Sequence, residues 1–181
     1  DIEAAMREFP NVKVILGVEA NIINSPNGLD IEKEDIHKFD IVNAGYHYGL
    51  PHGYMTSNYV CWHAGLPSGS REQLRNKNTE MALKALYEND IFILTHPGDK
   101  GPFDMKEICK ACEETNTLME ISTRHTHLTK EEIKIAANYD VKFAISSDAH
   151  KPDEVGNYIA GVERALEAGL DLDRIVNIEK R

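Results

Sequence analysis

Apolar runs of strand length alternate along this sequence with segments of helical periodicity. Five runs lead from apolar residues into small or polar ones: VKVILGVEA, DIVNAGYH, IFILTHPG, TLMEIST and VKFAISSDAH. Their apolar content is nearly continuous rather than alternating, which favours parallel strands covered on both faces. Strands and helices in this succession predict an α/β fold with right-handed crossovers. A later run, RIVNI, is a candidate for a further strand.

The segments between these runs carry helix signals. Thr129 is a good N-cap, followed by acidic residues in the first turn, and Gly169 can end the last helix. Residues 1–9 resemble the second half of an amphipathic helix. Residues 48–70 are rich in Gly, Pro and aromatic side chains and follow a strand end, which indicates an active-site loop. The predicted helices cover residues 71–89, 104–115, 129–139 and 153–169.

Length and charge limit the classes of function. With 181 residues, 41% of them hydrophobic, the chain can bury a core, and we expect residues 1–181 to form one domain. The net charge of -10 repels nucleic-acid backbones and anionic lipids, so nucleic acid is an unlikely partner. Three cysteines, an odd count, indicate reduced thiols and a cytoplasmic protein. No apolar run approaches membrane-spanning length.

Acidic and imidazole side chains stand where the predicted strands end. Because the carboxyl ends of parallel strands gather at one face of an α/β sheet or barrel, we expect these side chains to converge. Imidazole and carboxylate suit zinc, manganese and iron, and a glutamate between two ions can bridge them. Such a cluster activates water and binds phosphoryl oxygens, so it predicts hydrolysis of phosphate esters. In chain order the residues are Glu19, His47, His96, Glu120, Asp148 and His150.

Each of these residues also has a purely structural interpretation. His47 can be a hydrogen-bonded core histidine, His96 can shape a turn before Pro97, and Asp148 can cap the loop that follows it. Glu19 is harder to explain in this way, because a carboxylate placed directly after an apolar run is costly to bury unless it is paired or metal-bound. Taken together, the strand ends favour a shared cation site, since the structural interpretation requires the same coincidence at four of them.

The motifs GVEANI, AGYH, THPG, MEIS and SSDAH, in this order, resemble those of the PHP (polymerase and histidinol phosphatase) superfamily, and in particular its small trinuclear-metal phosphatases. The similarity extends from Val12 to Asn177. The resemblance implies a distorted (β/α)7 TIM-like barrel with metals at the carboxyl ends of its strands. The sequence itself departs from the family pattern, because the opening HxH motif of the family does not precede Asp1. We therefore expect an incomplete barrel without its first strands, the C-terminal three-quarters of a domain whose missing N-terminal segment would be a partner.

The resemblance also implies roles for individual residues. Glu19 would bridge two metals, His47 and His96 would complete one site, Asp148 would ligate the second ion and His150 the third. The ions would be zinc, or alternatively manganese or iron, up to three in the complete domain. Glu120 would orient a ligand rather than bind metal. Arg124, beyond the fourth strand, is either a bidentate partner of the substrate phosphate or a solvated loop residue. His125 and His127 are expected to be exposed on that loop, with the alternative that one of them reaches the substrate.

The leading functional hypothesis is a metal-dependent phosphoesterase that hydrolyses a small phosphomonoester, with catalysis involving Asp148, His150 and Arg124. One alternative is an exonuclease or polymerase-associated module of the same superfamily. Another alternative, suggested by the missing HxH motif, is a metal-poor remnant of the superfamily that acts as a scaffold. If the chain is an enzyme, it can still be inactive in isolation. The sequence selects neither the substrate nor the oligomeric state.

Overall fold

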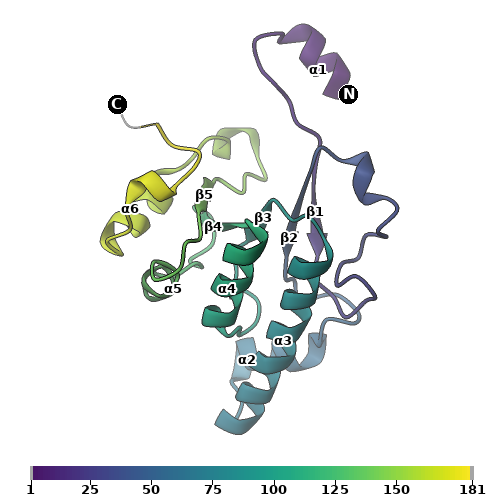
Figure 1. Cartoon of the computed structure of the whole chain (residues 1–181), viewed down its shortest axis with the longest axis vertical. Helices are drawn as coiled ribbons and strands as arrows, with labels where there is room; N and C mark the ends of the chain where they lie inside the picture. The colour runs from purple at the N-terminus through teal and green to yellow at the C-terminus, as the bar shows by residue number, and fades with distance from the viewer. Residues whose placement is uncertain (1, 180–181) are drawn as a thin grey trace.

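The chain forms a mixed α/β structure around one parallel sheet. The computed structural model describes residues 2–179 (Figure 1). Every neighbouring pair of strands is parallel, and the order in the sheet is the order in the chain, β1-β2-β3-β4-β5. The predicted α/β class with parallel strands is therefore confirmed. The strands are β1 (Gly17–Asn21), β2 (Ile41–Gly45), β3 (Ile93–Thr95), β4 (Leu118–Ser122) and β5 (Phe143–Ser146).

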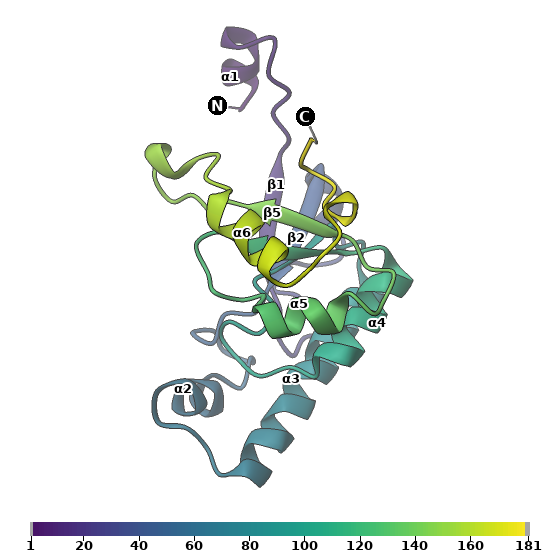
Figure 2. The same ribbon diagram turned by 90° about the vertical axis from the view of Figure 1, so that its left-hand side faces the viewer.

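Helices make most of the connections between strands. From α3 to α6, each helix contacts the next one along the chain, and α3 and α4 lie side by side in both ribbon views (Figures 1 and 2). The connection from β1 to β2 is different, since it is irregular apart from the 3-10 turn Ile36–Lys38. The other connecting helices are α2 (Met55–Ala64) and α3 (Ser68–Glu88) after β2, α4 (Met105–Thr115) after β3, α5 (Lys130–Ala136) after β4, and α6 (Ile159–Glu167) after β5.

Local sequence explains where the central helices begin and end. Thr129 forms a complete capping box with Glu132 at the start of α5, as its N-cap position predicted. The Asp104 side chain accepts a hydrogen bond from the backbone of Lys106 at the start of α4. The last helix is shorter than predicted. Pro152–Glu154 form only a 3-10 turn, and Gly156, at φ +79°, breaks the helical path, so α6 starts at Ile159.

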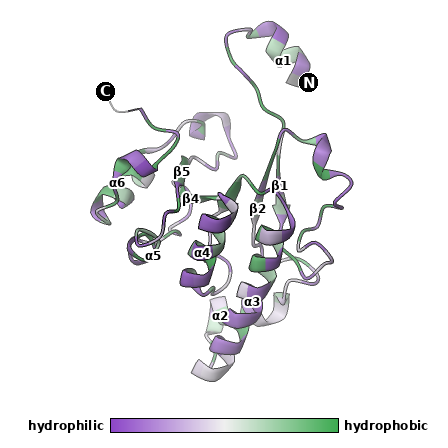
Figure 3. Cartoon of the chain, in the orientation of Figure 1, coloured by the Kyte–Doolittle hydropathy of each residue, from purple (hydrophilic) through white to green (hydrophobic). Residues whose placement is uncertain are grey.

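The core lies between the sheet and the helices that cover it. Figure 3 shows hydrophobic colouring concentrated along the strands and hydrophilic colouring on the outward turns of α3 and α4. Cys109 and Cys112 of α4 are free, fully buried thiols, as expected for core cysteines rather than a metal or redox pair. Other fully buried contributors from the helices are Ala82, Leu86, Ile108 and Ile133.

The first strand is shorter than the apolar run that predicted it. Only Gly17–Asn21 pair with β2, and residues 12–16 lead away from the sheet toward α1 (Ile2–Glu8), which lies apart from the rest in Figure 1. Val12, Ile15 and Leu16 are exposed there. Within the described residues β1 has a partner strand on one side only, so nothing covers the apolar side chains that precede it.

Two further predictions need correction. The expected loop 48–70 contains α2 and the first turn of α3, and it is held to α3 by reciprocal amide bonds between buried Asn58 and Asn78, at 3.0 and 2.8 Å. The run RIVNI makes a single parallel bridge, Ile175 to Phe143, rather than a strand. The Leu172–Arg174 turn occupies its start. In the part of the chain described, no helix is both long and apolar enough to cross a membrane.

Candidate metal centre

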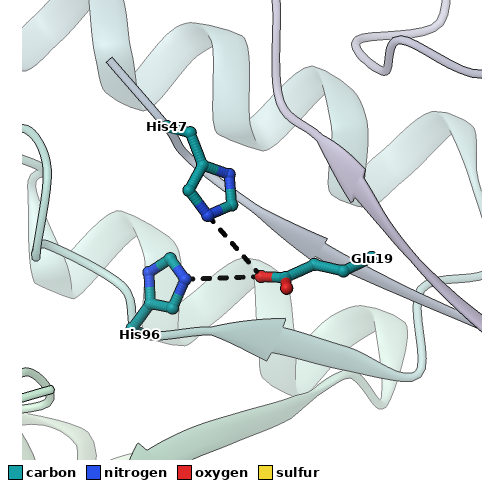
Figure 4. Close-up of side chains that lie close together, drawn as sticks. All are labelled: Glu19, His47 and His96. Carbon is teal, nitrogen blue, oxygen red and sulfur yellow. Dashed lines mark ion pairs between the residues drawn. The ribbon is translucent and has the colours of Figure 1, made fainter. Parts of the chain in front are cut away.

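Three predicted ligands, each from a different strand or strand end, face one another (Figure 4). Glu19 lies on β1, and His47 and His96 follow the ends of β2 and β3. The Oε1 atom of Glu19 lies 3.3 Å from Nε2 of His96 and 3.9 Å from Nε2 of His47. One ligand atom from each residue lies within 4.8 Å of the others, and among the described residues this is the one group of such side chains with that geometry.

The parallel register explains why these side chains meet. Glu19 stands opposite Asn43 in the β1–β2 ladder, and Gly45 stands opposite Thr95 in the β2–β3 ladder. A Cβ atom at Gly45 would lie 2.7 Å from Oε1 of Glu19. Only glycine at this position lets the carboxylate cross β2 toward β3.

A chain of hydrogen bonds fixes the orientation of His47. Asn21, two residues after Glu19 on β1, donates through Nδ2 to Oδ2 of Asp30 at 2.6 Å, while its backbone nitrogen donates to Oδ1 at 2.7 Å. Its Oδ1 atom is thereby turned to His47 and accepts from Nδ1 at 2.7 Å. Since Nδ1 carries the proton, the lone pair of Nε2 faces Glu19, which is the arrangement of a histidine that binds metal.

His96 is held by its backbone. It is 4% exposed and its φ is +28°, an uncommon conformation for a residue with a side chain. Its backbone nitrogen donates to Oε2 of buried Glu120 at 2.6 Å, and Oε1 of Glu120 accepts from the hydroxyl of Ser146. Nδ1 of His96 is buried without a hydrogen-bond partner in the described structure, and such an atom calls for an ion or a water.

Glu19 carries a full negative charge over the whole physiological range. The contact with His96, a 2.6 Å hydrogen bond from Thr95 Oγ1 and the charges of both histidines outweigh the effect of burial and lower its pKa to about 2. Glu19 is 39% exposed on its side chain, so its position does not require the deep burial that the preceding apolar run suggested. It is a carboxylate ready to accept a cation.

The two histidines differ in their readiness to lose a proton. Burial and the charge of His96 lower the pKa of His47 and outweigh the opposing charge of Glu19. Burial acts in the same direction on His96, but the contact with Glu19 and the charges of Glu120 and Glu19 outweigh it and raise its pKa. His47 therefore loses its proton more readily than His96, and a cation that binds both imidazoles must displace the proton that His96 holds more tightly.

Asp148 belongs to a second polar cluster beside the first. Its Oδ2 atom lies 3.1 Å from Nε2 of His125, whose Nδ1 atom lies 3.0 Å from Oδ2 of the buried Asp99. The His125 ring in turn packs against that of His96, with 4.6 Å between centroids. The two clusters are therefore neighbours, joined through His125. The expectation that His125 is an exposed loop residue is wrong, since its side chain is only 21% exposed.

The remaining predicted residues lie at the rim of this second cluster. Arg124 contacts Asp148 at 3.8 Å and Glu154 at 3.5 Å. His150 is 61% exposed and its Nδ1 lies 3.6 Å from Oδ1 of Asp148. The structure therefore brings the predicted residues into two adjacent groups, one of Glu19, His47 and His96 and one of Arg124, Asp148 and His150.

Outside these groups, the loop histidines differ in exposure. His127 is also partly buried rather than exposed, because its Nδ1 contacts Glu132 at 3.1 Å. His37, His52 and His63 are exposed.

Sequence reasoning missed several residues that support the centre. Asn21 was detectable, because residues two apart on a strand share a face and Glu19 was already a candidate. Thr95 and Asp99 flank His96 in the chain, but nothing in their spacing indicates that one contacts Glu19 and the other His125. Asp30 lies in an irregular segment with no pattern at all.

The donor set fits a divalent cation. Ligands of one zinc ion lie about 2.0–2.2 Å from it, and hence up to about 4.4 Å from one another. The Glu19, His47 and His96 atoms need only a small contraction to reach this geometry. A carboxylate and two imidazoles also suit manganese and iron.

Comparison with known proteins points to phosphatases. The chain is 26% identical to a probable phosphatase of Thermoanaerobacter sp. (strain X514), over 99% of this chain and 69% of that protein. It is 28% identical to a probable phosphatase of Proteus mirabilis (strain HI4320), over 97% of this chain and 67% of that protein. A probable phosphatase of Shewanella frigidimarina is 24% identical over 95% of the chain. No family model matches the chain. Nearly the whole chain is thus similar to proteins named probable phosphatases.

Proposed function

We propose that this protein is a metal-dependent phosphoesterase that hydrolyses small phosphomonoesters. The observation that carries the proposal is the meeting of Glu19, His47 and His96, from three neighbouring strands, around Oε1 of Glu19. The names of the relatives support the phosphatase part of the proposal. The net charge of -10 favours a small ligand over a nucleic acid.

Glu19, His47 and His96 would hold the cation, which is zinc, or alternatively manganese or iron. When bound, it supplies a water made acidic near neutral pH and positive charge for the phosphoryl oxygens. The chain's own residues prepare this place. Asn21 keeps Nε2 of His47 directed at Glu19, and Glu120 fixes the backbone of His96.

The second cluster would complete the site. Asp148 and His150 would provide ligands for further cations, and Arg124 would turn from Asp148 and Glu154 to pair with the substrate phosphate. Arg124 suits this role because its side chain is 43% exposed and its guanidinium contacts both acids at 3.5 Å or more, so these ion pairs are weak. The packing of His125 against His96 keeps the two groups close enough to serve one substrate.

The strand order supports the finer fold assignment, part of a distorted (β/α)7 barrel of the PHP type. In doubly wound sheets the strand order reverses, and ligands bind at that point. Here the order follows the chain without reversal, as it does around a barrel, and consecutive helices contact one another. The candidate ligands also stand at the carboxyl ends of the strands, where barrel enzymes place their sites.

Metal analysis and hydrolysis together test the proposal. Protein purified without chelator should contain zinc, manganese or iron, and it should hydrolyse p-nitrophenyl phosphate in a manner that a chelator abolishes. Glu19→Gln should lower both the metal content and the rate at least about 100-fold, whereas Glu80→Gln, an exposed change on α3, should alter neither. Metal-free protein, or a rate insensitive to Glu19→Gln, would exclude this function and favour a scaffold.

A further inference from the structure

A cavity lies beside the candidate metal centre and is separate from it. It has a volume of about 740 Å³ and lies between α2, α3 and the loop that follows β3. Gly98 and Lys100 line it, and Gly98 is two residues from His96, so their Cα atoms are within about 7 Å.

Among the described residues, three basic and two acidic side chains line the cavity, and the ammonium of Lys100 is already paired with Asp99 at 2.5 Å. Arg71 and Arg75 project from α3, and Lys100 comes from the loop after β3. The acidic side chains in the lining already have partners. Glu72 contacts Arg75 at 3.6 Å, and Glu132 accepts hydrogen bonds from Thr129 and contacts His127.

Two of the basic groups have capacity left for a ligand. The Arg71 side chain makes no ion pair or hydrogen bond within the described part of the chain, and the buried Nε atom of Arg75 has no hydrogen-bond partner there. The N-terminus of α3 opens at the same cavity through Ser68, and no side-chain hydrogen bond caps it. Its free backbone N–H groups add positive partial charge to that of the arginines.

We propose that this cavity binds a second anionic group on the alcohol portion of the substrate, through Arg71, Arg75 and the N-terminus of α3. This inference rests on the proposed phosphoesterase function. The substrate class is then a phosphomonoester whose alcohol carries a carboxylate or a second phosphate, and esters of neutral alcohols are poorer substrates. Arginine suits the role because its planar guanidinium binds both groups in a bidentate manner.

Trp62 provides a reporter that does not depend on catalysis. It lines the cavity, with the Lys100 ammonium 5.3 Å from the centre of its ring, and the sequence contains a single tryptophan. Chelator-treated protein is titrated with inorganic phosphate while the fluorescence emission of Trp62 is recorded. The same titration is followed by calorimetry, which also detects binding that does not change the emission. We expect saturable binding that Arg71→Gln weakens about tenfold, the effect of one charge-assisted hydrogen bond.

Lys84→Gln is the matched control, because it removes the same charge from an exposed position on α3 outside the cavity. It should leave phosphate binding unchanged. Arg71 is itself exposed and unpaired within the described residues, so Arg71→Gln should fold normally. Absence of binding in both methods, or equal affinity in the wild type and Arg71→Gln, overturns the proposal.

A kinetic comparison tests the substrate class. The metal-loaded protein should hydrolyse 4-carboxyphenyl phosphate with a kcat/KM about tenfold above that for phenyl phosphate, and Arg71→Gln should remove this preference through KM. Equal values in the wild type refute the cavity's role while leaving the phosphoesterase intact. The protein can also bind phosphate in a manner that depends on Arg71 and yet show no metal-dependent hydrolysis. That outcome supports the anion site and refutes the proposed phosphoesterase function.

Discussion

Asn21 accepts a hydrogen bond from Nδ1 of His47 at 2.7 Å and is itself fixed by two bonds to Asp30, at 2.6 and 2.7 Å. This contact decides which ring nitrogen of His47 faces Glu19. An imidazole free to rotate or to change tautomer binds metal less well, so the contact prepares His47 before any cation arrives.

Replacement of Asn21 should therefore weaken metal binding without abolishing it. Asn21→Ala is expected to lower zinc affinity about 10–100-fold, the usual effect of removing such a supporting partner. Competition with a chromogenic chelator measures this change. Asn76→Ala, on the exposed face of α3, is the control. Unchanged affinity in Asn21→Ala would show that His47 is not a ligand or does not need this support.

Metal affinity should rise with pH beyond the range of an ordinary histidine. The folded-state pKa of His96 is raised above 6.5, so the metal-free protein holds a proton there that the cation must displace. Affinity is expected to increase through pH 6.5 and to level off only above the raised pKa. Zinc titrations over a series of pH values test this. A plateau already reached below pH 6.5 would contradict the role of His96.

Glu120 should make the metal-free protein less stable as pH rises. Burial raises the pKa of Glu120 above 4.5, so the folded state binds this proton more tightly than the unfolded state does. Stability is therefore lost as pH increases from 4.5 through the raised value. Glu120→Gln keeps the shape and can still accept from His96, so it should lack this component. Urea unfolding of both proteins across the range measures the difference, and parallel curves would contradict the prediction.

The buried amide pair that anchors α2 should contribute to stability as one unit, so that replacing either asparagine removes the whole contact. Asn58→Ala leaves the Asn78 amide without its partner and is expected to cost about 1–3 kcal/mol of unfolding free energy. Asn78→Ala should cost a similar amount. In a double-mutant cycle the two losses should not add, because both changes remove the same contact. Additive losses would show that the pair does not act as a unit.

The strand ends were predictable because parallel strands place their carboxyl ends together, whatever the loops do. Glu19, His47 and His96 follow from that rule alone. His125 did not, because its partners Asp99 and Asp148 come from two other loops, and the sequence contains no sign of their approach. The helix α2 was also missed. Asn58 is its one buried residue in the described structure, so it has no apolar periodicity to detect.

Glu120 joins the backbone of His96 to the hydroxyl of Ser146, and so ties β5 to the loop after β3 across β4. None of these groups is near another in the chain. The candidate metal site that they support therefore forms only after the sheet has assembled. An unfolded polypeptide offers no equivalent. The free energy of metal binding to Glu19, His47 and His96 is therefore added to the unfolding free energy of the sheet. Metal binding should accordingly slow amide exchange in β1, β2 and β3 together.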